Sequence, residues 1–335
     1  MHAAHLIAPG TIEFADVAEP RPSAGEVLIA PLRLGICGSD VSIYQGHRQV
    51  PLPLTPGHEV VGRVAALGSE VTGFVPGQRV IVEPNYPCGI CRFCRSGRGR
   101  ICPDKVSMGV TAPGAAAEQV TAPANFVWAI PDTISDEDEA TIEPLAVALH
   151  AVNHSWARPG ETVAVVGCGA IGLLIVQVAV QIGLRVLAHD LAEEKLDLAA
   201  KLGAERAGSE DPAALWLERG VATVFESAGV ANAVETCIAA APRGSEVVLL
   251  GLGGKPASFS PFRLVREGIR ISTSLIYDHP HDFARCIELV GTGALRPSAT
   301  VTHTFPLERL GSALDLAGTG NCGKIHITIG GQSAA

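Results

Sequence analysis

The sequence predicts an α/β protein that combines an irregular β-rich domain with a doubly wound parallel sheet. Residues 1–135 contain short strand-like stretches separated by proline and glycine, such as GEVLIAPLRLGI and EVVGRVAALG. After residue 160, strand-like and helix-like stretches alternate, as in VATVFESAG followed by VETCIAAAPRGSEVVLLGLGG. This alternation is typical of a parallel sheet that carries helices on both of its faces.

The composition favours a globular protein and disfavours nucleic-acid binding. Of the 335 residues, 47% are hydrophobic and 18% are charged, which is enough apolar material for a large core. The net charge of −9 would repel phosphate, so a zinc-ribbon nucleic-acid binder is disfavoured. We interpret the arginines of the cysteine-rich segment as a solvated loop: Arg92, Arg95, Arg98 and Arg100.

Nothing in the sequence favours export or membrane insertion. The N-terminus, MHAAHLIAPGTIEF, lacks the basic and apolar regions of a signal peptide. Residues 162–184 carry no charge and are long enough to span a bilayer. They contain three glycines at a phosphate-loop spacing, however, which favours a buried strand–helix unit. We therefore expect a cytoplasmic protein that does not bind a membrane.

Four of the nine cysteines lie within the segment YPCGICRFCRSGRGRIC, at positions 88, 91, 94 and 102. Disulfide bonds, a metal site and a redox or catalytic site are the three alternatives. Disulfides seldom persist in a reducing cytosol, and two-residue gaps allow neighbouring thiolates to face a common centre. The spacing therefore predicts that Cys88, Cys91, Cys94 and Cys102 bind a structural zinc ion. Because four thiolates close the coordination shell, the chemistry should lie elsewhere.

A second group of metal-binding residue types lies upstream, in LGICGSD and PGHEVVGRV. Cys37, His58 and Glu59 are all suitable ligands for zinc, and they come from different segments, as ligands of open catalytic sites often do. The alternative is a buried thiol and a hydrogen-bonded structural histidine.

A further carboxylate, Glu143, lies in TIEPLAVALHAV at the expected start of an apolar helix. A carboxylate at the edge of a buried helix needs a partner. It is either a metal ligand or an N-terminal cap of the helix, and the spacing leaves both possibilities open.

The segment ETVAVVGCGAIGLLIVQVAV predicts a dinucleotide-binding loop between a strand and a helix. The first glycine allows a tight turn, the second lets the backbone approach a pyrophosphate, and the third lets helix and strand pack closely. The expected cofactor-binding residues of this loop are Gly167, Gly169, Ala170, Ile171 and Gly172.

The next strand-like stretch, LRVLAHD, ends in a carboxylate that favours NAD over NADP. Asp190 follows Gly172 by 18 residues, where it is placed to accept hydrogen bonds from a ribose diol. It would repel a 2′-phosphate, and the following residues, LAEEK, contain no arginine. Lys195 either flanks the ribose or is a solvated helix lysine.

With these motifs in order, the chain resembles the zinc-dependent medium-chain dehydrogenase/reductase family. The resemblance runs over essentially the whole chain and rests on GICGSD, PGHEVVGRV, the four-cysteine segment, EPLAVALHAV and VVGCGAIGLL. The glutamate of IEPLAVALH resembles the polyol branch, which contains sorbitol, threonine, butanediol, glucose and aminocyclitol dehydrogenases. These motifs are specific for the family but not for a substrate.

The resemblance implies a GroES-like catalytic domain at 1–148, with a structural zinc lobe at 86–102. It implies a Rossmann NAD-binding domain at 149–280 and a C-terminal return to the catalytic domain at 281–335. It also implies two zinc ions per chain, one catalytic and one structural, and a homodimer or homotetramer. The segment GIRISTSLIY is either an interface strand or an ordinary buried strand.

For the catalytic zinc, the resemblance implies Cys37 and His58 as ligands, with Glu59 or Glu143 as the third. Asp40 would orient His58, and Lys324 would approach Asp40 from the C-terminal segment. Ser39 would take the proton of the alcohol.

One departure from the family concerns the path of that proton to solvent. Many relatives carry a histidine three residues after the serine, where this chain has Ser42. His47 is one possible substitute, and a chain of water molecules is another.

The expected activity is the transfer of a hydride from a secondary alcohol of a polyol, sugar or cyclitol to NAD, which gives a ketone. Carboxylate ligands would make the metal site polar, which suits a hydroxyl-rich substrate. Tyr44, His47 and Arg48 favour the same substrate if they lie near the site, and each is also compatible with an ordinary surface loop. The alternatives are an enzyme similar to L-threonine 3-dehydrogenase, a simple secondary-alcohol dehydrogenase, and a non-enzymatic sensor of NAD(H).

Overall fold

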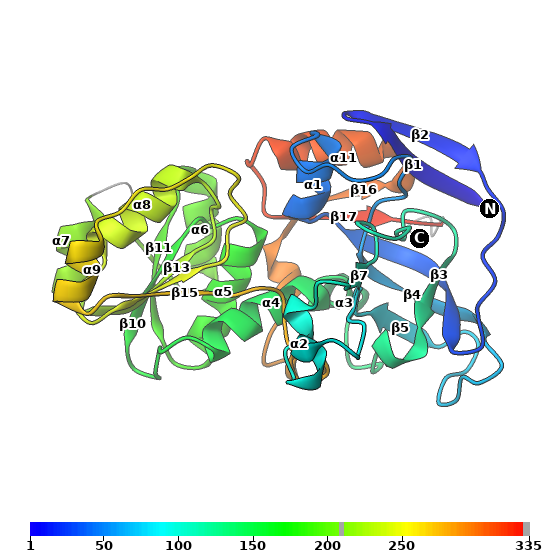
Figure 1. The fold of residues 1–335 in the computed structure, drawn as a ribbon, viewed down its shortest axis with the longest axis horizontal. Coiled ribbons are helices and arrows are strands. Elements are labelled where there is room, and N and C mark those ends of the chain that lie inside the picture. The colour runs from blue at the N-terminus through cyan, green and yellow to red at the C-terminus, as the bar shows by residue number, and fades with distance from the viewer. Residues whose placement is uncertain (208–210, 331–335) are drawn as a thin grey trace. The chain divides into compact units, whose positions relative to one another are not determined.

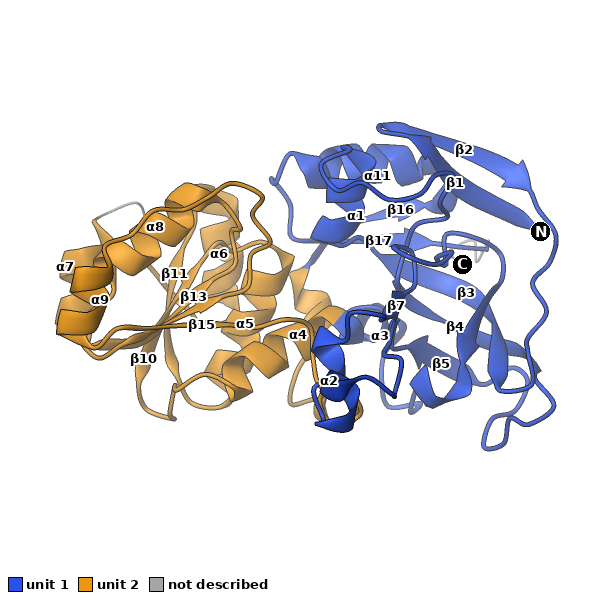
Figure 2. Ribbon diagram, in the orientation of Figure 1, with its two compact units in different colours: residues 1–143, 290–292, 301–335 blue, residues 144–289, 293–300 orange. Residues whose placement is uncertain are grey.

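The computed structural model describes residues 1–207 and 211–330, which form two compact units (Figure 2). Unit 1 comprises Met1–Glu143, Val290–Thr292 and Val301–Ala335. Unit 2 comprises Pro144–Leu289 and Gly293–Thr300. The chain therefore enters unit 2 at 143/144, touches unit 1 at residues 290–292 and returns to it for good at 300/301. The sequence analysis places these boundaries at 148/149 and 280/281.

Unit 1 is built on a seven-stranded sheet with the path β16-β17-β3-β4-β5-β9, to which β8 is added by pairing with β3 (Figure 1). A hairpin of β1 and β2 and a short pair of β6 and β7 complete its strands. Their bounds are β1 His2–Ala8, β2 Thr11–Asp16, β3 Glu26–Gly35, β4 Glu59–Leu67, β5 Arg79–Val82, β6 Asn85–Tyr86, β7 Val106–Ser107, β8 Val120–Pro123, β9 Val127–Ala129, β16 Val301–Pro306 and β17 Lys324–Thr328.

The register of β3 explains how the C-terminal segment becomes part of unit 1. On one side, β3 pairs antiparallel with β4, with Gly35 opposite Glu59. On the other side, it pairs antiparallel with β17, with Gly35 opposite His326. This register brings the start of β4, the end of β3 and the start of β17 to the same place in the sheet.

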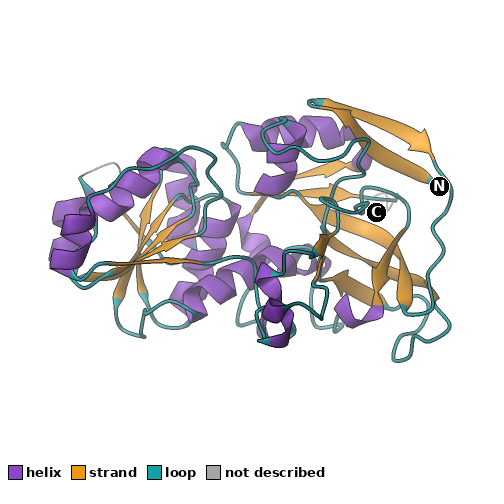
Figure 3. Ribbon diagram, in the orientation of Figure 1, coloured by secondary structure: helices purple, strands orange, loops and turns teal. Residues whose placement is uncertain are grey.

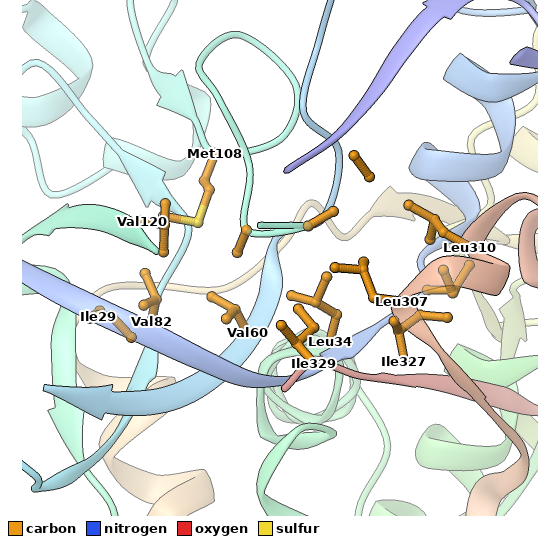
Figure 4. Packing of buried hydrophobic residues seen from close by; sticks show 14 of the residues in the cluster. Ile29, Leu34, Val60, Val82, Met108, Val120, Leu307, Leu310, Ile327 and Ile329 are labelled. Atoms are coloured by element: carbon orange, nitrogen blue, oxygen red, sulfur yellow. The ribbon is translucent and has the colours of Figure 1, made fainter. Parts of the chain in front are cut away.

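The core of unit 1 is a continuous apolar cluster that joins segments from both ends of the sequence (Figure 4). Ile29 and Leu34 from β3 pack in one cluster with Ile327 from β17 and with Leu310 from helix α11 (Leu310–Gly318). All four side chains are at most 2% exposed, so the apolar area that they bury stabilises the return of the C-terminal segment to this sheet.

Unit 2 contains a six-stranded, fully parallel sheet with the order β12-β11-β10-β13-β14-β15 and helices on both faces (Figure 3). In chain order this is 3-2-1-4-5-6, the order of doubly wound dinucleotide-binding sheets. The strands are β10 Thr162–Val166, β11 Arg185–His189, β12 Glu205–Arg206, β13 Val221–Glu226, β14 Glu246–Leu249 and β15 Arg270–Thr273. The α/β prediction is confirmed.

The helices are short, and among the described residues none is long and apolar enough to span a bilayer. Residues 162–184, the one segment with the length for a span, divide into β10 and α5. The helices are α1 Gly38–Tyr44, α2 Arg92–Arg95, α3 Asp136–Glu139, α4 Ile142–Asn153, α5 Ala170–Gln181, α6 Glu193–Lys201, α7 Pro212–Glu218, α8 Ala231–Ala240, α9 Pro261–Glu267, α10 His281–Gly291 and α11 Leu310–Gly318.

Candidate active site

The four cysteines of the lobe at 86–102 converge on one centre. Their sulfur atoms all lie within 4.8 Å of one another. The Cys91 and Cys94 sulfurs are 3.5 Å apart, and the Cys88–Cys94 and Cys91–Cys102 pairs are both 3.9 Å apart. A tetrahedral zinc ion with bonds of about 2.3 Å to sulfur separates its ligands by about 3.8 Å. The donor set and its spacing therefore fit a closed zinc site.

Backbone amides of the lobe point at the sulfur atoms. The amide of Cys91 donates to the Cys88 sulfur at 3.4 Å, and that of Cys94 donates to the Cys91 sulfur at 3.5 Å. Hydrogen bonds from the amides of Ile90 and Cys91 lower the pKa of Cys88 to about 7. The turns of this loop therefore favour the thiolate at Cys88, which is the form that binds metal, whereas burial raises the pKa of Cys94 to about 12.

Cys37, His58 and Glu59 form a second group, whose ligand atoms also lie within 4.8 Å of one another. Cys37 precedes α1, and Glu59 begins β4 with His58 directly before it. Cys37 is half-buried, whereas His58 is 8% and Glu59 1% exposed. A thiol, an imidazole and a carboxylate that face one another away from water suit a divalent cation such as zinc.

Asp40 orients this group from the first turn of α1. One of its carboxylate oxygens accepts a hydrogen bond from the Cys37 amide at 2.9 Å. The other lies 3.3 Å from Nδ1 of His58. Burial alone would lower the pKa of His58, but the Asp40 carboxylate raises it well above its usual range. An aspartate on Nδ1 leaves Nε2 of the ring for a metal ion.

Lys324 comes from the C-terminal segment and acts electrostatically on Asp40, as the resemblance implies. Its ammonium also forms an ion pair with Glu59, which the sequence does not indicate, and donates a hydrogen bond to the carbonyl of Ile36 at 2.8 Å. The cause is the register of β17 and β4, which both lie beside the end of β3. Both charged side chains are only 1% exposed. Burial alone would raise the pKa of Asp40, but His58, the Cys37 amide and, with the smallest contribution, Lys324 lower it below its usual value.

Glu143 lies in the first turn of α4, where a carboxylate stabilises the helix through its dipole. The helix begins one residue earlier, at Ile142, so Glu143 does not precede the helix as a cap. The side chain is 5% exposed. Within the described part of the chain, the group formed by Cys37, His58 and Glu59 does not include it.

The remaining expected residues of α1 have different surroundings. Ser39 is half-buried, two residues after Cys37. Tyr44 is 7% exposed, and its hydroxyl lies 3.1 Å from both the Gly10 carbonyl and an Asp315 carboxylate oxygen. This burial disagrees with the expectation that it meets a substrate. His47 is exposed and its backbone amide bonds to the carbonyl of Ser42.

In unit 2, the glycine-rich loop joins β10 to α5 at the centre of the parallel sheet. Gly167 adopts φ +92°, which favours glycine, and Gly169 precedes the first residue of α5. A Cβ atom on Gly172 would lie 1.8 Å from the Gly167 carbonyl oxygen, whereas one on Gly169 would meet nothing within 4 Å. The third glycine thus permits close packing, and the second leaves open space in which a pyrophosphate fits.

Asp190 directly follows β11, and its carboxylate contacts the glycine-rich loop. Its carboxylate accepts hydrogen bonds from the amides of Cys168 at 2.7 Å and Ala192 at 3.0 Å. The Lys195 ammonium lies 3.6 Å from the same carboxylate. A carboxylate held at the carboxyl end of the second strand is the feature that hydrogen-bonds an adenosine ribose in doubly wound folds.

Comparison with known proteins agrees with these features. Residues 23–132 match the alcohol dehydrogenase GroES-like domain, and residues 170–292 match the zinc-binding dehydrogenase family. The chain is 34% identical to an L-threonine 3-dehydrogenase from Anaeromyxobacter sp. (strain K) over 327 residues, which cover 94% of each protein.

It is also 33% identical to a sorbitol dehydrogenase from Bacillus subtilis, over 95% of this chain and 93% of that one. The chain is a zinc-binding dehydrogenase of the alcohol dehydrogenase type. An alcohol dehydrogenase from Escherichia coli, solved in complex with NADH, has a TM-score of 0.91 at 28% identity. The aligned region covers 98% of the present chain and 99% of the Escherichia coli chain.

Membership in this family confirms the prediction of an oxidoreductase that uses zinc and NAD(P) on an alcohol or polyol. Sequence reasoning missed the partner of Glu59, because Lys324 lies in the last strand of the chain and no motif links the two. It also missed the burial of Tyr44, whose partner Asp315 lies in α11. The register of the sheet decides the first contact, and the packing of α1 against α11 decides the second.

Proposed function

We propose that this dehydrogenase oxidises a secondary alcohol of a polyol, sugar or cyclitol with NAD, giving a ketone and NADH. The observation that carries the proposal is the buried group of Cys37, His58 and Glu59, in which a carboxylate accompanies the softer ligands. A ligand set with a carboxylate is more polar than one of thiolates and imidazole, which suits a hydroxyl-rich substrate.

Cys37, His58 and Glu59 would hold the catalytic zinc ion, with Glu143 as the alternative carboxylate, and the four-cysteine lobe would hold a second, structural ion. When bound, the catalytic zinc supplies the Lewis acidity that lowers the pKa of a substrate hydroxyl. Asp40 keeps the His58 ring in position, and Lys324 balances the charge of Glu59. These two residues act through the ligands and do not touch the substrate.

Ser39 is proposed to accept the proton of the alcohol at its hydroxyl oxygen. It is half-buried in the first turn of α1, whose preceding residue is the ligand Cys37. Ser42 replaces the histidine that relatives carry, so the proton reaches solvent through water or through the exposed His47.

NAD would bind at the glycine-rich loop, with the pyrophosphate at Gly169 and the adenosine ribose at Asp190. Bound NAD supplies the carbon that accepts the hydride. The amides of Cys168 and Ala192 hold the Asp190 carboxylate, and its negative charge would repel the 2′-phosphate of NADP. The absence of an arginine from the next five residues, LAEEK, supports the same preference.

An amino alcohol such as threonine is the competing substrate, because the relative with 34% identity is an L-threonine 3-dehydrogenase. The sorbitol dehydrogenase with 33% identity supports the polyol.

We also propose a cytoplasmic homodimer or homotetramer. The proposed oligomer is supported by the edge strand β15. Within the described part of the sheet this strand pairs only with β14, so its other edge is open to a second copy of the chain.

The test is NADH absorbance with purified protein, NAD and a panel of sorbitol, xylitol, ribitol, myo-inositol, glucose, threonine, 2,3-butanediol and ethanol. We expect one polyol or sugar to give the highest kcat/KM and a zinc chelator to remove the activity. Highest kcat/KM with threonine or ethanol would overturn the substrate class. No turnover of any alcohol by protein that binds NAD would favour the sensor.

Two serines of the same short helix provide a matched pair of variants. Ser39→Ala should lower kcat by a factor of about 10²–10⁴, the range that general acid–base groups contribute. Ser42→Ala, three residues further along α1 and also half-buried, should retain near-normal kcat. Equal kcat in the two variants would exclude Ser39 as the proton acceptor.

A further inference from the structure

Unit 2 contains a group of metal-binding side chains outside the glycine-rich loop. His150 lies in the last turn of α4 and His154 directly follows that helix. Asp278 lies in the segment before α10, and Asp282 is in the first turn of α10. Ligand atoms of His150, His154 and Asp278 all lie within 4.8 Å of one another.

A hydrogen bond fixes the proton arrangement of His154. Its Nδ1 lies 3.0 Å from the carbonyl oxygen of His150. Because a carbonyl oxygen only accepts, Nδ1 of His154 carries a proton. In the neutral ring, Nε2 therefore presents its lone pair, and this atom lies 3.7 Å from a carboxylate oxygen of Asp278. Metal-binding histidines commonly donate their other ring N–H to a backbone carbonyl in this way.

A second carboxylate, that of Asp282, lies beside His150. Nδ1 of His150 lies 2.7 Å from a carboxylate oxygen of Asp282 and 4.0 Å from the Asp278 oxygen that faces His154. The same Asp282 oxygen accepts a hydrogen bond from the Asp278 amide at 2.8 Å. His150 is only 2% exposed, so this contact is shielded from water.

Two imidazoles and one carboxylate thus face one another at the end of α4, with a second carboxylate, Asp282, beside His150. Imidazole nitrogen and carboxylate oxygen are ligands that suit a divalent transition-metal ion.

We propose that His150, His154 and Asp278 bind a divalent transition-metal ion, with zinc as the ion that suits two imidazoles and a carboxylate, while Asp282 lies beside His150. Histidines four residues apart on a helix end present their rings on one side, as in helical zinc sites. Here the two ring centroids are 4.0 Å apart.

The distances are close to those of a coordinated ion. Bonds of about 2.0–2.2 Å to nitrogen and oxygen separate tetrahedral ligands by about 3.4 Å. The measured separations of 3.7 Å and 4.0 Å from the Asp278 oxygen need to shrink by only a few tenths of an ångström. The ion would displace the proton that Nδ1 of His150 shares with Asp282, and this proton would leave to solvent.

The site has an entry path and a structural consequence. The His154 side chain is 53% exposed, so an ion can reach the group from water without any opening of the core. Once bound, the ion would tie the end of α4 to the start of α10. These two helices are distant in sequence, and α4 is the helix whose first turn carries Glu143.

The experiment is the zinc content of purified protein equilibrated at buffered free zinc, measured by mass spectrometry. We expect His154→Gln and Asp278→Asn each to hold one zinc ion per chain fewer than the wild type. His303→Gln, which changes an exposed histidine of unit 1, is the matched control and should leave the content unchanged. Circular dichroism and thermal unfolding establish that the variants are folded.

The test uses the difference in zinc content per chain between the wild type and each variant, and not the total zinc content. This difference should therefore persist in a Cys37→Ser background, where the proposed catalytic ion is lost, so this inference and the proposed function fail separately. Equal zinc content in the wild type and both variants would overturn the inference. Loss of an ion in His303→Gln would place the third ion elsewhere and would also overturn it.

Discussion

The ion pair between Lys324 and Glu59 gives a sharp test of how unit 1 is held together. Lys324→Met removes the ammonium and leaves the Glu59 carboxylate, 1% exposed, without its counter-charge. Breaking a buried pair by removing one partner costs about 3–5 kcal/mol. The simple Coulomb energy at hydrogen-bond separation and an effective dielectric constant of about 20 is on the order of 5 kcal/mol, which is consistent with this range.

The double variant separates the charge effect from the loss of packing. In Glu59→Gln/Lys324→Met no buried charge remains without a partner, so we expect the double variant to be about 2 kcal/mol or more stable than Lys324→Met alone. The control cycle uses Arg285 and Glu288, an ion pair whose side chains are 53% and 61% exposed. Its coupling should stay below about 1 kcal/mol.

The assay is urea unfolding followed by tryptophan fluorescence. With a slope of about 2 kcal/mol per molar urea, a loss of 3 kcal/mol lowers the midpoint by about 1.5 M. A zinc ion on Glu59 would balance part of its charge, so the loss should be largest after dialysis against a chelator mild enough to spare the four-cysteine lobe. A loss below about 1 kcal/mol in Lys324→Met, or no recovery in the double variant, would refute the reasoning.

Three further predictions concern other parts of the molecule. Cys94→Ser should lower the zinc content by one ion per chain and reduce the soluble yield, and unchanged zinc would contradict a structural site. Gly172→Ala should weaken NAD binding at least tenfold in a fluorescence titration, because its Cβ would lie 1.8 Å from a backbone oxygen; unchanged affinity would exclude this packing role. Burial, with the charges of Lys324 and Arg33, lowers the pKa of His326 to about 3, so the folded state resists its protonation. Because the unfolded chain binds this proton below about pH 6.5 and the folded chain does not, the free energy of unfolding falls by about 1.4 kcal/mol per pH unit below that pH. His326→Gln removes this contribution. Its urea midpoint should therefore fall less between pH 7.5 and 5 than that of the wild type.

Local spacing in the sequence was enough for the features that short segments build by themselves. The four-cysteine lobe needs only 15 residues and its own turns, and the glycine-rich loop needs one strand and one helix. Their residue types and gaps therefore indicate both the backbone geometry and the chemistry. The alternation of strand and helix patterns likewise indicated the parallel sheet, because each pattern follows from which face of an element is buried.

The tertiary structure alone decided which distant side chains meet. Glu59 pairs with Lys324 because β4 and β17 both lie beside the end of β3, and this register is set by the packing of the whole sheet. His150 meets Asp278 and Asp282 because α4 and α10 converge within unit 2. Local patterns carry no information about such contacts, since many registers and helix arrangements bury the same apolar faces. Only the packed structure selects one of them, and with it the buried charges that need a partner.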